Sequence, residues 1–177
     1  MLWRSTTGAG SFSTRGGDIV DAEGGAVRLA AVNWFGLETR NGAPEGLGNR
    51  VWTEMMDQMK TLGFNAIRLP FSSDLIDGRV PPANINYTLN PDLRGVSGVQ
   101  LIDRIVDYAG QIGLRVILDR HRGTAGDGAA QNGFWFDYDT QNGHSEADWI
   151  ADWVMLAERY RGNATVVGAD LHNEPHG

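Results

Sequence analysis

The sequence predicts an α/β fold, namely the first half of a (β/α)8 TIM barrel preceded by a β-hairpin. One theme recurs three times: an amphipathic helix ends at a glycine, and a short apolar strand follows. The three glycines, Gly63, Gly113 and Gly162, lie about 50 residues apart. Apolar strands that alternate with helices indicate a parallel sheet covered by helices. A complete barrel takes about 250 residues, so 177 residues with four strands predict half of one.

The N-terminal part predicts a lead-in followed by a hairpin. Residues 1–17 are expected to be a lead-in or linker, because the stretch from position 5 is rich in Ser, Thr and Gly. Residues 18–177 are expected to form the half-barrel. Within it, residues 19–21 and 26–29 flank the turn sequence Ala-Glu-Gly-Gly, which favours a hairpin. The second arm continues into residues 30–36, the expected buried first strand.

Three helices follow, each with apolar residues at helical spacing. The three stripes consist of Val51, Met55, Met59 and Leu62, then Ile102, Ile105, Val106 and Ala109, and finally Ile150, Trp153, Val154, Ala157 and Tyr160. A capping-box pattern, Ser97 with Gln100, marks the start of the second helix, and Ser145 with Asp148 marks the third. The strands that follow these helices are expected at residues 64–70, 114–119 and 165–172.

The long connections follow the strands, at residues 71–95 and 120–144. Loops at the carboxyl ends of strands carry the active sites of βα barrels. Doubly wound sheets place their ligands at the same end, so loop position alone does not separate the two folds. The strand count and the chain length favour the barrel.

Composition limits the classes of partner. The formal net charge is -7 and there is no cysteine. An acidic surface argues against nucleic acid and against anionic membranes, and it suits an uncharged partner such as a sugar. The absence of cysteine excludes disulfides and thiolate metal sites. No apolar run has the roughly 20 residues of a membrane span, and no signal peptide is visible at the start.

The end of the fourth strand carries the strongest candidate for chemistry, the segment from Leu171 to His176. Pro175 should end the strand and hold Glu174 extended at the rim of the sheet. If alternation continues without a bulge, Asp170, His172 and Glu174 share one face. A carboxyl group in such a partly dry cleft can protonate a leaving oxygen. The plain alternative is a surface glutamate before a loop proline.

Four ordered blocks, one per strand, resemble bacterial cellulases of glycoside hydrolase family 5. The blocks are residues 31–39 (AVNWFGLET), 67–70 (IRLP), 117–122 (ILDRHR) and 170–176 (DLHNEPH), and the resemblance extends from about residue 10 to residue 177. It implies a TIM barrel, no cofactor and a β-glucan polysaccharide or oligosaccharide as substrate. It also implies an extracellular enzyme, an endo-β-1,4-glucanase that cleaves with retention, and a partner in the missing C-terminal half of the barrel.

The resemblance also assigns roles to matching residues. Glu174 corresponds to the general acid/base and Asn173 to the residue that hydrogen-bonds the sugar 2-hydroxyl. Arg68 resembles the strand-two arginine that pairs with the nucleophile, and His121 resembles the histidine beside the cleaved bond. Each of the two also has a purely structural interpretation.

Aromatic residues are the candidates for sugar platforms. Trp34, Phe35 and Trp135 are expected either to stack on sugar rings or to pack in the core. The sequence departs from related cellulases after the first strand. Those often have Gly-Leu-Trp there, whereas residues 46–48 of this chain are Gly-Leu-Gly. An aromatic platform at the entrance of the cleft is therefore expected to be lost.

The family nucleophile comes from strand seven, which this chain does not supply, so the 177 residues alone are expected to be inactive. A homodimer of half-barrels would bring the third strand, ending in Asp119, into that place, but with an aspartate instead of a glutamate. Other interpretations stay open: a zinc site using residues such as His172 and His176, a non-catalytic carbohydrate-binding protein, or another β-glycanase such as a mannanase. Pro175 argues against the zinc site, because it breaks any helix that would align the two histidines.

Overall fold

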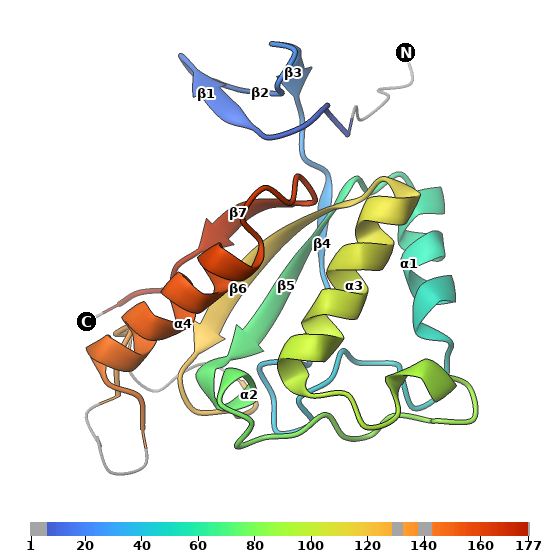
Figure 1. Cartoon of the computed structure of the whole chain (residues 1–177), viewed down its shortest axis with the longest axis vertical. Coiled ribbons are helices and arrows are strands. Elements are labelled where there is room, and N and C mark those ends of the chain that lie inside the picture. Colours follow the sequence, from blue (N-terminus) through green and yellow to red (C-terminus); the bar gives the residue numbers. More distant parts are fainter. Residues whose placement is uncertain (1–6, 129–132, 138–142, 177) are drawn as a thin grey trace.

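The computed structural model describes residues 7–128, 133–137 and 143–176. A small antiparallel sheet lies at the N-terminus, and a larger parallel sheet forms the body (Figure 1). The small sheet contains β1 (Ser13–Arg15), β2 (Asp18–Val20) and β3 (Ala26–Val27) in that order. Strands β2 and β3 are the predicted hairpin, paired antiparallel.

Strand β1 lies within the expected lead-in. Ser13 pairs with Val20 and Arg15 with Asp18, so part of the segment before residue 18 belongs to the sheet. Its three side chains are exposed and polar, and the strand is therefore held by backbone pairing, which leaves no apolar alternation in the sequence to detect. Residues 1–6 of the expected lead-in lie outside the described residues.

The parallel sheet consists of β4 (Ala31–Asn33), β5 (Ala66–Ser72), β6 (Arg115–Arg122) and β7 (Val166–Asp170), in the order β4-β5-β6-β7. Consecutive strands are neighbours, as the half-barrel prediction requires. The expectation of a buried first strand was wrong, because β4 has both its outer residues exposed. Among the described residues it pairs on one side only, with β5.

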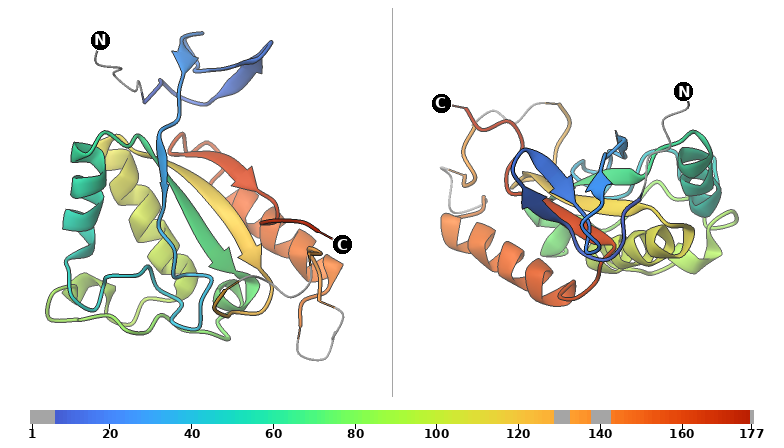
Figure 2. Two further views of the ribbon diagram at one scale, coloured as in Figure 1. Left: turned by 180° about the vertical axis from the view of Figure 1, so that it is seen from behind. Right: turned by 90° about the horizontal axis from the view of Figure 1, so that it is seen from above.

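Helices cover one face of this sheet. The helices α3 (Gly98–Ile112) and α4 (Glu146–Arg159) lie behind it in the left view of Figure 2, and α1 (Trp52–Thr61) lies at its side, which leaves the opposite face in view. The short helices α2 (Ser73–Ile76) and η1 (Pro91–Leu93) belong to the connection from β5 to α3. Within the described ranges, no helix is both long and apolar enough to cross a membrane.

Alternation along the strands separates core from site. In β6, Val116, Leu118 and Arg120 are buried on the face toward the helices. Asp119 and His121 alternate with them and therefore lie on the opposite face of the sheet. The core between sheet and helices includes Ile67, Leu69, Phe71, Leu101, Ile102, Ile105, Val106 and Ala109. The predicted stripe of α3 is thus confirmed.

The other two stripes are only partly correct. In α1 the buried residues are Trp52 and Met56, and Leu62 is 68% exposed. In α4, Ile150 and Val154 are each about half exposed. The periodicity therefore located these helices but did not fix the side that each one buries.

The helix boundaries follow the predicted caps. Ser97 and Gln100 form both reciprocal bonds of a capping box, and Ser145 and Asp148 form the same pair at α4. Gly113 ends α3 with φ at 73°, the left-handed conformation that favours glycine. The cap at Gly113 ends α3 shortly before β6 begins, and the capping box at Ser145 sets the start of α4.

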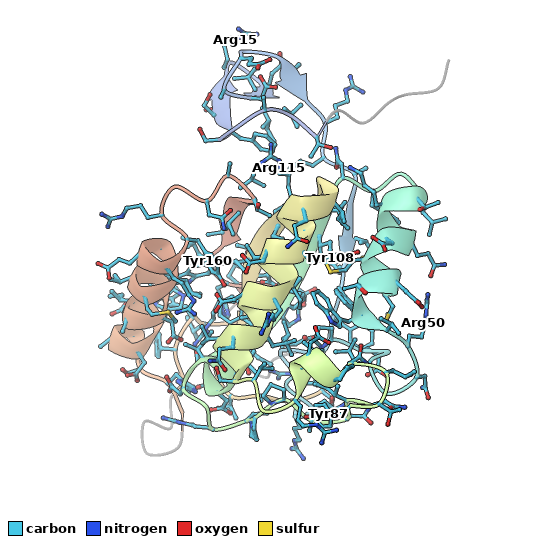
Figure 3. All side chains as sticks on the ribbon, turned by 45° about the vertical axis from the view of Figure 1, so that its right-hand side comes forward. Arg15, Arg50, Tyr87, Tyr108, Arg115 and Tyr160 are labelled. Carbon is cyan, nitrogen blue, oxygen red and sulfur yellow. The ribbon has the colours of Figure 1, made fainter. Side chains whose placement is uncertain are left out.

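Arg115 joins the small sheet to the body. Its guanidinium donates to the backbone carbonyls of Thr7, Gly8 and Ala164 and lies 5.2 Å from the centre of the Phe12 ring. Figure 3 shows Arg115 between the N-terminal sheet and the start of β6. The small sheet therefore lies at the end of the parallel sheet where the strands begin, opposite to the strand ends described next.

Candidate active site

Polar side chains from three neighbouring strands meet near the carboxyl ends of the parallel sheet. Arg68 comes from β5, Asp119 and His121 from β6, and Asp170 from the last position of β7. Asn173 follows three residues later. Because parallel strands run in register, with Asp119 beside Asp170, residues far apart in sequence come together at this edge.

Arg68 is the centre of this group. Its Nη2 donates to Asp170 Oδ2 at 2.6 Å and to Asn173 Oδ1 at 2.9 Å. Its Nη1 contacts Asp119 Oδ2 at 2.9 Å and Asn33 Oδ1 at 3.3 Å. The predicted Arg68 pairing with a strand-seven carboxylate is not tested in this chain. Its guanidinium instead bridges two carboxylates of β6 and β7, an arrangement in which charge-assisted hydrogen bonds fix the planar group.

His121 and Asn173 close the group into a ring. His121 Nδ1 is 2.7 Å from Asp119 Oδ2, and its Nε2 is 3.3 Å from Asn173 Nδ2. Arg68 contacts both Asp119 and Asn173, so each of these four residues contacts two of the others. Three of the four are predicted site residues, and the structure brings them together.

Glu174 follows directly after this ring, but its conformation differs from the predicted one. Its φ is +46°, in the left-handed region, instead of extended. Pro175 disfavours the right-handed helical conformation for the preceding residue, and the chain resolves this by turning the other way. A left-handed non-glycine residue costs of order 1–3 kcal/mol, and such residues concentrate at functional sites.

The Glu174 side chain is exposed, so the partly dry cleft expected around its carboxyl is not formed by the described residues. The segment around it is held by backbone contacts. His176 N–H donates to Gly133 O at 3.2 Å, and His176 Nδ1 lies 2.7 Å from Glu174 O. The loop that contains Gly133 therefore supports the end of the Glu174 segment.

The predicted alternation of Asp170, His172 and Glu174 fails after Asp170. Strand β7 ends there and residues 172–174 bend. His172 consequently contacts Arg120, on the helix-facing side of β6, while Asp170 contacts Arg68 on the other side. The bend also lets Asn173 reach Arg68, although alternation would have placed it away from Asp170.

Arg120 is a buried residue of the site that the sequence interpretation did not single out. It is 1% exposed, with Nε donating to Ser73 Oγ at 3.1 Å and Nη1 3.3 Å from His172 Nδ1. Burial, and then the nearby Arg120 guanidinium, lowers the pKa of His172 to about 4. The Arg120 carbonyl also accepts from Asn173 N–H at 3.3 Å, so this residue holds the segment before Glu174 at two points. Alternation along β6 places Arg120 on the same side as the apolar residues Val116 and Leu118. This pattern in the sequence could have identified Arg120 as a buried arginine.

The aromatic candidates separate clearly. Trp34 is 4% exposed, donates from Nε1 to Glu45 O and belongs to the core, so its predicted role as a sugar platform is corrected. Its neighbour Phe35 is 52% exposed. One-residue alternation explains the difference, because consecutive side chains point to opposite sides.

Trp135 lies in a pocket at the same end of the sheet. The pocket has a volume of about 560 Å³ and is lined by Trp135, Glu146, Trp149, Asp170, Leu171, His172 and Pro175. The indole N–H of Trp135 donates to Glu146, and that of Trp149 donates to the Leu171 carbonyl. The polar edges of both rings are thus satisfied, and apolar surface predominates in the pocket.

The zinc interpretation finds no support in the geometry. Across residues 7–128, 133–137 and 143–176, no group of three or more His, Asp or Glu side chains could hold a metal ion. Asp119 and His121, which also have metal-ligating side chains, contact each other, and Asp119 pairs with Arg68. The arrangement instead fixes the Asn173 amide between Arg68 and His121, directly before Glu174 in the chain.

Comparisons with known proteins identify the family and the fold of the chain. Residues 20–177 match the family model described as Cellulase (glycosyl hydrolase family 5). The endoglucanase of Paenibacillus polymyxa is 47% identical over 168 residues, which cover 95% of this chain and 41% of that protein. The major extracellular endoglucanase of Xanthomonas campestris pv. campestris is 40% identical over 159 residues, 90% of this chain and 31% of that protein.

Solved structures give the same result. The endocellulase from Pyrococcus horikoshii, in its complex with cellotetraose, matches with a TM-score of 0.84 and 38% identity, over 97% of this chain and 45% of that chain. The chain thus spans less than half the length of these relatives. The predicted fold class, half of a TIM barrel, is confirmed by this match.

Proposed function

Because the chain belongs to the cellulase family, glycosyl hydrolase family 5, we propose that it carries the acid/base half of an endo-β-1,4-glucanase. The substrate class is a β-1,4-glucan, polymeric or oligomeric, cut at internal glucosidic bonds with retention and without a cofactor. The names of its relatives, two endoglucanases and an endocellulase studied with cellotetraose, support this class.

The chemistry assigns Glu174 a double role. As the acid it protonates the leaving glycosidic oxygen while a second carboxylate attacks the anomeric carbon. As the base it then takes a proton from the water that hydrolyses the covalent intermediate. Retaining enzymes place the two carboxyl groups only about 5–5.5 Å apart. Asn173 donates to the sugar 2-hydroxyl, and Arg68 and His121 line the site beside the cleaved bond.

One observation carries the proposal: Asn173 is bound by both Arg68 and His121. Two residues from two strands, Arg68 of β5 and His121 of β6, therefore converge on the position immediately before Glu174. A surface glutamate in front of a loop proline would not need a neighbour fixed from two strands.

We propose further that the 177 residues alone have negligible turnover. No glutamate of the chain matches the motif of the family nucleophile, and Asp119, the residue a dimer would offer, is fully buried between Arg68 and His121. The second carboxylate would come from the C-terminal half of a barrel, the expected partner of this half.

The test joins this chain to the C-terminal half of the Paenibacillus polymyxa endoglucanase, which is 47% identical in the first half. The joined protein should release reducing ends from carboxymethylcellulose, and the product anomer observed by NMR should be β. Glu174→Gln should lower the rate by about 100-fold or more, within the range for general acid–base catalysis. Glu158→Gln, the same change at an exposed position of α4, serves as the control. Equal activity of the two variants would contradict the role of Glu174.

A second candidate function, carbohydrate binding without hydrolysis, is favoured by one observation, the Trp135–Trp149 pocket. Aromatic faces bind sugars independently of a carboxylate. Calorimetric titration of the joined protein with cellotetraose separates the two candidates: binding that Trp135→Ala abolishes, with no hydrolysis, would favour the binding protein.

We also propose that the protein acts outside the cell. The support is a relative described as a major extracellular endoglucanase, together with a substrate class too large to enter cells. An antibody against this chain should detect the protein in culture medium, and its confinement to cells would contradict the location.

A further inference from the structure

Asp119 lies at the point where the contacts of Arg68 and His121 meet. We propose that Asp119 is a positioning residue: it sets the tautomer of His121 and, through His121, the orientation of the Asn173 amide. The inference rests on the proposed function, because the amide it orients is the one proposed to bind the sugar.

The contacts of Asp119 are those of a fixed acceptor. It is 0% exposed, and its Oδ2 lies 2.7 Å from His121 Nδ1 in a hydrogen bond and 2.9 Å from Arg68 Nη1 in an ion pair. Its Oδ1 is also buried and has no hydrogen-bond partner within the described residues. A carboxylate held this way has no donor of its own, so the proton of that bond must lie on His121 Nδ1.

This proton decides what the other nitrogen of His121 can do. A neutral imidazole with its hydrogen on Nδ1 has a lone pair on Nε2. Nε2 faces Asn173 Nδ2 at 3.3 Å, so the amide N–H donates to it. The opposite tautomer, which is the more common one for a free histidine side chain, would direct a hydrogen at a donor.

Arg68 fixes the same amide from the other side. Arg68 Nη2 can only donate, and it lies 2.9 Å from Asn173 Oδ1. The two contacts together allow a single amide orientation, with oxygen toward Arg68 and nitrogen toward His121. The second N–H of Asn173 is then left for the substrate, so this residue meets a sugar hydroxyl as a donor.

Removal of the Asp119 charge should therefore act beyond its own contacts. Without the acceptor at Nδ1, His121 can carry its hydrogen on Nε2, and two donors then face each other. A flipped Asn173 amide would satisfy His121 but would set its N–H groups against Arg68. Neither orientation of the Asn173 amide would then satisfy every donor. A buried hydrogen-bond network that is only partly satisfied is destabilising.

The first measurement is the tautomer itself. Long-range ¹H–¹⁵N NMR of the 177-residue chain at about pH 8, above the ordinary histidine pKa, distinguishes the two forms. The His121 signal is assigned by its loss in His121→Gln. The wild type should show the hydrogen on Nδ1, and Asp119→Leu, which removes the acceptor, should shift His121 toward the Nε2–H form. Asp170→Asn is the matched control, since it also removes a negative charge beside Arg68 but does not touch His121.

The second measurement uses the chain joined to the C-terminal half described above. Asp119→Leu should lower kcat/KM by about 10- to 100-fold, the equivalent of one or two buried hydrogen bonds. The loss should fall mainly on kcat, because an oriented donor matters most where the sugar contact strengthens.

The outcomes separate this inference from the proposed function. A wild-type His121 with its hydrogen on Nε2, or a tautomer unchanged in Asp119→Leu, would overturn the positioning role. An inactive joined wild-type protein with the expected tautomer would instead count against the glucanase proposal and leave the role of Asp119 supported.

Discussion

His172 should make the folded chain less stable as the pH falls, and the effect has a defined sign. Burial and the Arg120 guanidinium lower the pKa of His172 from 6.5 to about 4. Between these two values the unfolded chain binds a proton that the folded chain does not. Stability is therefore complete above pH 6.5 and is lost progressively as the pH falls toward 4.

The size of the effect follows from the two pKa values. Their difference corresponds to about 3.4 kcal/mol when the pH is below both of them. His172 is only partly buried, so solvent screening reduces this to about 1.5–2 kcal/mol. Between pH 7.5 and pH 5 the part attributable to His172 should be about 1 kcal/mol.

The assay is urea unfolding of the 177-residue chain at these two pH values, followed by far-UV circular dichroism. His172→Gln keeps an acceptor for Arg120 but has no proton to gain, so its loss of stability between pH 7.5 and pH 5 should be about 1 kcal/mol smaller than that of the wild type. His176→Gln makes the same change at an exposed position and should retain the wild-type dependence. If His172→Gln and the wild type lose equal stability, the His172–Arg120 contact does not control this titration, and the reasoning is refuted.

Two further predictions test the backbone and the N-terminal sheet. Gly36→Ala should destabilise the chain by several times more than Gly63→Ala in thermal unfolding. A Cβ at Gly36 would lie 2.2 Å from Ala43 O, whereas a Cβ at Gly63 would have nothing within 4 Å. At Gly63 only the positive φ opposes alanine, at a cost of about 1 kcal/mol. Arg115→Met removes the hydrogen bonds to carbonyls of the N-terminal segment and should cost about 2–3 kcal/mol, with faster proteolysis before residue 30. The exposed Arg104→Met is the control, and equal cleavage rates would show that Arg115 does not hold the sheet.

The local signals of the sequence were sufficient for the three long helices, the four parallel strands and their order. The capping boxes at Ser97 and Ser145 and the glycine at position 113 end or begin helices through contacts between near neighbours. Such contacts depend on a few adjacent residues, so the pattern and the structure agree. The strand-end position of Arg68 and His121 followed in the same way, from strands that must be parallel.

The tertiary structure decided what each side chain faces. Trp34 is buried while Phe35 is exposed, and Ile150 in α4 remains half exposed despite its apolar stripe. Burial depends on which elements pack against a residue, and the periodicity within one helix or strand contains no information about that neighbour.

The active-site segment shows the same division at finer scale. The sequence by itself determined that Asn173-Glu174-Pro175 follows the fourth strand of the parallel sheet and that the chain matches a glycosidase family. Only the tertiary structure revealed the bend after Asp170, which directs His172 to Arg120 and Asn173 to Arg68 and His121. The reason is physical: the conformation there is set by hydrogen bonds to residues more than 50 positions away, which outweigh the local preference for an extended strand.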